Sequence, residues 1–262
     1  MWATQPSLGC ASPTALLVHH DKAGRVDRVH ATLTARGIRG PYLVDTGSLA
    51  SFSTHTGEEV ATSTTATLGC EETTLPIIGR LLPGATPEGE PQAGVLGANL
   101  VAHGAVLDLD LEKATLGWSQ LAPATPPGAV VLPVERRKGW LVASGIRLRG
   151  RDVKLVVDTG ASNVIVLDKT PRAGEMREDT VDGTASPITL WHGEGEISFG
   201  GGPTRHVPVD RTDAFRTLES VLAELGPDVE GLLGITALGR ERVIISAESL
   251  TLVLPAISPN PL

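Results

Sequence analysis

Short apolar runs separated by glycine, proline and polar residues follow one another along most of the chain. Residues 29–33 alternate apolar and polar positions and residues 155–157 are continuously apolar, so both predict strands, with turns at Gly37 and Gly150. Residues 106–111 alternate in the same way, and residues 243–245 are again continuously apolar. The pattern predicts an all-β protein.

A single segment has helical periodicity. Its apolar residues recur at intervals of three and four, with Asp213 near the start and Gly226-Pro227 at the end. These residues are Phe215, Leu218, Val221, Leu222 and Leu225. No such segment is evident in the first half of the chain, and we expect the helix to cover a sheet and to take no part in chemistry.

Two apolar runs end in the same tripeptide, Asp45-Thr46-Gly47 and Asp158-Thr159-Gly160. The residues sixteen, twelve, nine and eight positions before each aspartate also match. They are Val29 and Val142, Leu33 and Ile146, Arg36 and Arg149, and Gly37 and Gly150. Downstream, Gly94-Val95-Leu96-Gly97 corresponds to Gly231-Leu232-Leu233-Gly234. These matches indicate an internal duplication with unequal insertions.

A proline-rich stretch separates the two copies, and its composition favours an extended connector. We therefore expect an N-terminal lobe over residues 1–122, a connector over residues 123–128 and a C-terminal lobe over residues 129–262. The chain has 262 residues, which fits two compact lobes. Its 30 glycines, 19 prolines and 3% aromatic residues suit short strands joined by tight turns.

Charge and hydropathy exclude some classes of partner. The net charge of -8 and the pI of about 5.4 argue against nucleic acid, because phosphate binding requires clustered Lys and Arg. No apolar run approaches the roughly 20 residues of a membrane span, so none is predicted. The first residues lack the basic start and apolar stretch of a signal peptide, and an extracytoplasmic location, periplasmic or secreted, is slightly favoured.

Two carboxyl groups at matching strand ends can share one catalytic task. If they lie a few ångströms apart, they cannot both ionise easily, and at acidic pH they share a proton. The ionised group can then take a proton from an attacking water while the protonated group donates to a carbonyl oxygen. Asp45 and Asp158 are thus candidate catalytic residues for hydrolysis of a peptide bond.

The paired motifs, with the two apolar-apolar-Gly elements that follow them, resemble the pepsin and retropepsin superfamily of aspartic peptidases. The resemblance covers most of both halves and looks most like two fused retropepsin-like units. It implies two β-barrel-like lobes related by a pseudo-twofold axis, few short helices, a peptide or protein substrate held between the lobes, a monomer and no cofactor.

The resemblance also assigns residues. Asp45 and Asp158 would form the catalytic dyad, and the Thr46 and Thr159 hydroxyl groups would bond to the backbone of the opposite lobe. Gly47, Gly160 and Ser162 would support the active-site turns. Gly97 and Gly234 would pack near those turns.

The hairpin that closes over substrate, the flap, departs from the pepsin pattern. Pepsins place a tyrosine there, but the only tyrosine here, Tyr42, precedes the first motif. Candidate flap residues are Gly69 and Cys70 in the first half, and Gly183 and Thr184 in the second. Trp191, at the start of a glycine-containing stretch over residues 191–195 that we expect to turn, is another candidate. The alternative function is therefore a catalytically silent module that binds peptides without cleaving them.

Other candidate sites are weaker. The acidic series Asp108, Asp110 and Glu112 lacks the spacing of a calcium loop, and the seven histidines form no metal-binding motif, so no metal is expected. Cys10 and Cys70 could form one disulfide or remain two thiols.

Overall fold

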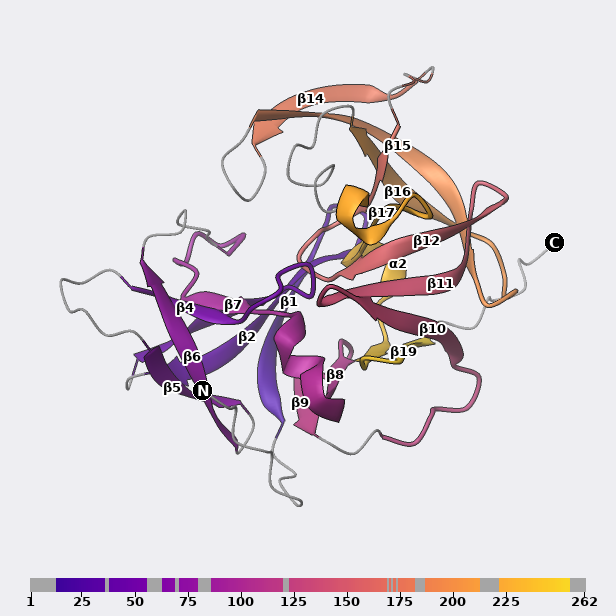
Figure 1. Ribbon diagram of the computed structural model, residues 1–262. Helices are drawn as coiled ribbons and strands as arrows, with labels where there is room; N and C mark the ends of the chain where they lie inside the picture. Colours follow the sequence, from indigo (N-terminus) through magenta and orange to yellow (C-terminus); the bar gives the residue numbers. More distant parts are fainter. Residues whose placement is uncertain are drawn as a thin grey trace.

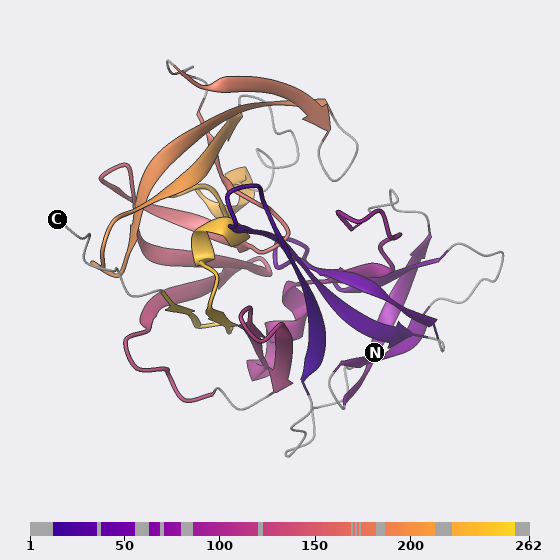
Figure 2. The same cartoon turned by 180° about the vertical axis from the view of Figure 1, so that it is seen from behind.

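The computed structural model describes residues 13–35, 38–55, 63–68, 71–79, 86–119, 123–168, 170, 172, 174–181, 187–212 and 222–254 (Figures 1 and 2). Most of these residues lie in strands, which confirms the all-β prediction. Helical residues in these ranges are confined to η1 (Ala98–Gly104), α2 (Ile235–Leu238) and residues 222–225.

The first half of the chain builds a sheet in which two strands run parallel to earlier ones. Strand β3 pairs with β2 in an antiparallel hairpin and with β7 in parallel, while β4 runs parallel to β6 and antiparallel to β7. The strands of this half are β1 (Thr14–His20), β2 (Val26–Ala35), β3 (Ile38–Val44), β4 (Phe52–His55), β5 (Ser63–Leu68), β6 (Glu71–Gly79), β7 (Gly94–Leu96), β8 (Val106–Asp110) and β9 (Thr115–Ser119).

The second half repeats this connectivity. Strand β12 pairs with β11 in an antiparallel hairpin and with β17 in parallel, while β13 runs parallel to β16 and antiparallel to β17. The strands of this half are β10 (Val130–Arg137), β11 (Trp140–Leu148), β12 (Arg151–Asp158), β13 (Val164–Leu167), β14 (Met176–Val181), β15 (Pro187–Phe199), β16 (Arg205–Thr212), β17 (Val229–Gly234), β18 (Arg242–Ile245) and β19 (Ser249–Val253).

A third sheet contains strands from both halves. Its order is β1, β9, β8, β18, β19 and β10, and all its pairings are antiparallel. The two halves meet where β8 pairs with β18, with Leu107 opposite Ile245 and Leu109 opposite Val243. These four side chains belong to one buried apolar cluster that also includes Leu33 of β2 and Val157 of β12. Each fully buried aliphatic side chain of this kind contributes about 1.5–3 kcal/mol to folding.

The strand predictions agree with this architecture. Residues 29–33 and 155–157 lie within β2 and β12, and the predicted strands over residues 106–111 and 243–245 correspond to β8 and β18. The turn predicted at Gly150 follows β11, with φ of 51° at Arg149 and 79° at Gly150. Gly37 lies outside the described residues.

The predicted helix is described only at its end. Residues 213–221 lie outside the described residues, and residues 222–225 are helical. The helix stops at Gly226, whose φ of 109° suits glycine and whose amide donates to the Leu222 carbonyl at 3.1 Å.

The turn expected over residues 191–195 is wrong. These residues lie in the middle of β15, which pairs with β14 on one side and β16 on the other. A Cβ atom on Gly195 would lie 2.7 Å from a methyl carbon of Val209, so this glycine makes room for a neighbouring side chain. The turn comes later, at Gly200 and Gly201, where φ is 55° and 75°.

Among the helices of the described part of the chain, none is both long and apolar enough to cross a membrane.

Candidate functional site

The two Asp-Thr-Gly turns are joined by a symmetrical set of hydrogen bonds. The Thr46 amide donates to the Thr159 hydroxyl at 3.1 Å, and the Thr159 amide donates to the Thr46 hydroxyl at the same distance. Each hydroxyl in turn donates at 2.7 Å to a carbonyl of the opposite half, Thr46 to Val157 and Thr159 to Val44. Both threonines are fully buried, so water cannot replace these bonds.

This arrangement brings each aspartate against the opposite glycine. A Cβ atom on Gly47 would collide with the Asp158 carboxyl group, and one on Gly160 would collide with the Asp45 carboxyl group. Only glycine leaves room for these two contacts. The structure therefore places Asp45, Gly47, Asp158 and Gly160 in one cluster, although they come from the two halves of the chain.

Backbone amides hold the two carboxyl groups in place. Asp45 accepts from the Ser48 amide at 3.1 Å, while Asp158 accepts from the Gly160 and Ala161 amides at 3.0 and 3.1 Å. Asp158 is buried, with 9% exposure, and Asp45 is half-buried.

The environment raises the pKa of both carboxyl groups. For Asp45, burial and then the adjacent charge of Asp158 hold the pKa well above its usual range. For Asp158, burial raises the pKa, and hydrogen bonds from Asp45 and from the turn amides offset part of that rise. Because the two groups interact directly, they titrate as a pair.

Gly97 and Gly234 lie directly behind the two turns. A Cβ atom on Gly97 would lie within 2.7 Å of the Ser48 and Ala50 carbonyl oxygens, and one on Gly234 would collide with the Asn163 carbonyl. The residue after each glycine donates to the turn: Ala98 to Ser48 at 2.7 Å, and Ile235 to Ala161 at 2.8 Å. The strands β7 and β17 thus fix the backbone of the turns.

The residues that follow the motifs are used differently in the two halves. Ser162 is half-buried, and its carbonyl accepts from the Thr236 amide at 2.9 Å. In the first half, the Ser48 hydroxyl donates to the Ala50 carbonyl at 2.9 Å. Both serines shape the backbone next to the aspartates.

A polar chain that was not predicted leads from the second turn to the hairpin of β14 and β15. Asn163, next to Ser162, donates to the buried Asp210 on β16 at 3.0 Å. His192 on β15 contacts the other oxygen of Asp210 at 2.8 Å and Glu178 on β14 at 2.8 Å. Burial lowers the pKa of His192, but the two carboxylates outweigh burial and raise it overall. In the sequence, the only sign of this series of hydrogen bonds was that Asn163 follows Ser162.

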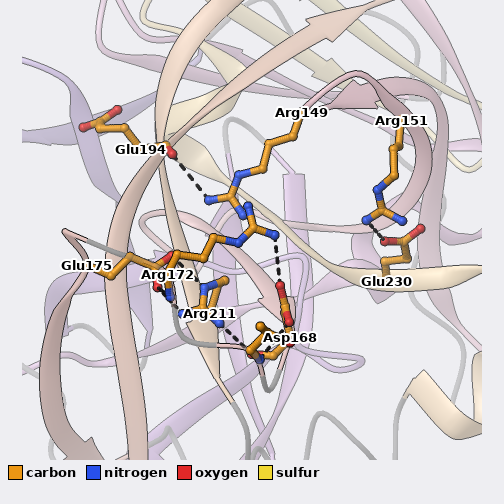
Figure 3. A network of polar contacts seen from close by, with 9 residues as sticks. Arg149, Arg151, Asp168, Arg172, Glu175, Glu194, Arg211 and Glu230 are labelled. Atoms are coloured by element: carbon orange, nitrogen blue, oxygen red, sulfur yellow. Dashed lines mark hydrogen bonds and ion pairs between the residues drawn. The ribbon is translucent and has the colours of Figure 1, made fainter.

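A buried ion pair anchors the segment before β14 (Figure 3). Arg211 on β16 is fully buried and forms a bidentate pair with Glu175, and it also donates to the Asp168 carbonyl at 2.9 Å. Its guanidinium carbon lies 5.5 Å from the centre of the Trp191 ring. Arg172 contacts Asp168 at 3.0 Å. The candidate flap residue Trp191, which lies in β15, therefore packs against the guanidinium group of Arg211, which the ion pair with Glu175 holds in place.

The other candidate flap residues cannot be placed. Gly69, Cys70, Gly183 and Thr184 lie outside the described residues, as does Cys10. Strand β5, which precedes Gly69, pairs with the distal end of β2, where Thr67 lies opposite Thr34. Tyr42 is buried and its hydroxyl contacts Ser53 at 3.0 Å, so it belongs to the core.

The acidic series forms ion pairs with basic side chains. Asp108 binds Arg242 of β18 with contacts of 2.8 and 2.5 Å, and Asp110 contacts Lys113 at 2.7 Å. Across the described ranges, no group of three or more His, Cys, Asp or Glu side chains is arranged to hold a metal ion.

In comparisons with known proteins, no protein-family model matches the sequence, and no curated protein is significantly similar to it.

Proposed function

We propose that this protein is an aspartic endopeptidase of the pepsin and retropepsin type, with Asp45 and Asp158 as its catalytic dyad. The observation that carries the proposal is the reciprocal contact of the two Asp-Thr-Gly turns. Each carboxyl group packs against the glycine of the other turn, and the Thr46 and Thr159 hydrogen bonds hold both turns together.

The proposed chemistry is acid and base catalysis by a pair that shares one proton. The charge is better stabilised on Asp158, because the hydrogen bond between the two carboxyl groups lowers the pKa of Asp158 and raises that of Asp45. Asp45 would therefore carry the proton and donate it to the substrate carbonyl. Asp158 would take a proton from the attacking water, which gives a gem-diol intermediate without a covalent enzyme adduct.

The proposal includes the larger arrangement. The repeated connectivity of the two halves supports two lobes related by a pseudo-twofold axis, divided as residues 1–122 and 129–262 with a connector over residues 123–128. The axis would pass between β8 and β18 and between the two turns. Since one chain supplies both aspartates, it would act as a monomer on a peptide or protein substrate, without a cofactor.

The test is cleavage of a mixed peptide library between about pH 3 and pH 7, which brackets a shared-proton pair. Wild type is compared with Asp45→Asn and Asp158→Asn. Asp152→Asn is the matched control, because Asp152 lies on the same strand as Asp158 and is 91% exposed. We expect each dyad variant to lose at least about a thousandfold in rate and the control to retain full rate. Folded wild type that cleaves nothing in this range would contradict the proposal.

The second candidate is the silent peptide-binding module, and the burial of Tyr42 favours it because the chain then has no tyrosine to close over a substrate. The statine inhibitor pepstatin distinguishes the two candidates when combined with the cleavage assay. A rise in melting temperature with pepstatin, absent in Asp158→Asn, together with no cleavage, would support the binding module.

A further inference from the structure

A basic pocket lies outside the candidate catalytic site, where three distant segments of the chain meet. Its volume is about 200 Å³. Its lining includes Arg25 from the turn between β1 and β2, Arg205 and His206 from the start of β16, and Arg240 after α2. Among the described residues no acidic side chain lines it, although the chain has 30 acidic and 22 basic residues.

Arg205 lines this pocket, and no carboxylate pairs with it in the described part of the chain. Its Nη2 donates to the Ala237 carbonyl at 2.7 Å, and its guanidinium carbon lies 5.1 Å from the centre of the Phe199 ring. Its Nε is buried and has no hydrogen-bond partner among the described residues. Burial is the one cause that lowers the pKa of this guanidinium, with no acid to raise it.

Arg205 as a whole is half-buried, and the part of its guanidinium that is buried is incompletely satisfied. A buried charge needs a partner of opposite charge or a full set of hydrogen bonds, and one carbonyl and one ring face supply only part of that. Arg25 is different, since Asp21 and Glu194 contact it at 2.7 and 3.2 Å. An anion in the pocket would supply what Arg205 lacks.

The pocket has room for such an anion. A Cβ atom on Gly24 would meet no atom within 4 Å, and one on Gly239 would lie 3.7 Å from Arg205 Nη1, so there is open space beside both glycines. The volume is sufficient for a carboxylate or a single phosphate group. Arginine guanidinium groups bind both kinds of oxyanion through paired hydrogen bonds.

We propose that this pocket binds a small carboxylate or phosphate oxyanion through Arg205, with Arg240 as the second cation. The bound anion would contact the region of α2 that supports the second Asp-Thr-Gly turn, because Thr236 lines the pocket and its amide holds Ser162. Figure 2 shows the hairpin of β1 and β2 reaching α2, where the Thr236 hydroxyl donates to the Val26 carbonyl at 2.9 Å. This inference does not depend on the proposed peptidase activity.

The test is thermal unfolding and calorimetric titration with inorganic phosphate and, separately, with succinate, at constant ionic strength set with sodium chloride. The proteins are wild type, Arg205→Met, Arg240→Gln and the control Arg136→Met, since Arg136 is an exposed arginine outside the pocket. We expect one or both anions to raise the melting temperature of wild type and of the control. Loss of Arg205 should weaken binding by tenfold or more, as expected for a charge-assisted contact.

The two anions identify the source of the ligand, because preference for succinate points to a carboxylate and preference for phosphate to a phosphorylated or inorganic ligand. Arg240→Gln keeps the test decisive if Arg205→Met does not fold, because Arg240 is exposed. Two results would overturn the proposal: no response of wild type to either anion, or equal affinities in wild type and Arg240→Gln together with any folded Arg205→Met.

Discussion

Thr46 and Thr159, 113 positions apart in the chain, exchange hydrogen bonds in which each amide donates to the other hydroxyl at 3.1 Å. Each hydroxyl therefore accepts one bond and donates another, so its single donor and one of its two lone pairs are used inside the protein. The same four hydrogen bonds therefore both position the two turns and stabilise them.

Replacing either threonine by valine keeps the shape and removes the hydroxyl. We expect Thr46→Val or Thr159→Val to cost about 1–3 kcal/mol, because an amide and a carbonyl of the opposite turn are left buried without a partner. Each substitution removes a different pair of bonds, but the cost of the double variant should still differ from the sum, since the two residues belong to one hydrogen-bond network. Urea unfolding measures all three variants, with exposed Thr34→Val on β2 as the control. Full additivity would show that the two threonines act independently.

The contact of each aspartate with the opposite glycine gives a second prediction. Gly47→Ala and Gly160→Ala introduce a methyl group that collides with a carboxyl group, so each should lose about 2 kcal/mol or more and most of any hydrolytic activity. Gly117→Ala on β9 is the matched control, because its new methyl carbon would meet Asp108 at an ordinary 3.5 Å. If Gly47→Ala and Gly117→Ala were equally stable, the two turns would not be in contact.

A third prediction concerns the pH dependence of the pair. Burial and the neighbouring Asp158 raise the pKa of Asp45 in the folded protein. The folded state therefore binds this proton more tightly than the unfolded state does. The pair therefore favours folding at acidic pH, and this contribution is lost as pH rises through the raised pKa. The melting temperature of Asp45→Asn minus that of wild type should increase as pH rises from about 4 to 8.

The control for this experiment has the opposite sign. Arg137 and then Lys154 lower the pKa of Asp228 in the folded protein. The contribution of Asp228 to stability is therefore present above the unfolded pKa of about 3.9 and is lost at lower pH. Asp228→Asn should therefore lose stability relative to wild type at neutral pH, with the difference shrinking in acid. The same sign for both variants would contradict the assignment.

The polar chain through His192 gives a fourth prediction. The pKa of His192 in the folded protein is above the ordinary value because Asp210 and Glu178 outweigh burial. The contribution of His192 to stability is therefore complete below about pH 6.5 and is lost as pH rises through the folded pKa. The loss of melting temperature in His192→Gln should be larger at about pH 5.5 than at about pH 8.5. His206→Gln, at a site where the side chain is 74% exposed, should show little change at either pH.

The buried pair of Arg211 and Glu175 gives a fifth prediction. Arg211→Met should cost about 3–5 kcal/mol, because it leaves the Glu175 carboxylate buried and unpaired. The double variant Arg211→Met with Glu175→Leu should recover most of that loss, since no buried charge remains. Chemical denaturation of the three variants measures both effects. A double variant as unstable as the single one would show that the Asp168 and Trp191 contacts of Arg211 dominate.

Part of this picture could be predicted from the sequence. The all-β fold followed from short alternating and continuously apolar runs, and the position of Asp45 and Asp158 at strand ends followed from the apolar residues before them. The dyad's role stays a prediction. The turn expected over residues 191–195 was wrong because glycine there serves neighbours such as Val209, which periodicity along one strand cannot reveal.

Contacts between distant side chains were beyond the sequence. His192, Asp210 and Glu178 lie on three adjacent strands with no shared motif, and their bonds depend on register. Nothing in the sequence distinguishes Arg205 from other basic residues, and only the packing of α2 and the hairpin of β1 and β2 near it reveals that none of the described carboxylates pairs with it.

The pairing of β8 with β18 has a consequence for how the molecule could be divided. Each of these strands would be an exposed edge strand if the other half were absent, and the apolar side chains Leu107, Leu109, Val243 and Ile245 would face water. Cutting the chain within residues 123–128 should therefore give two fragments that aggregate alone and assemble by complementation when mixed.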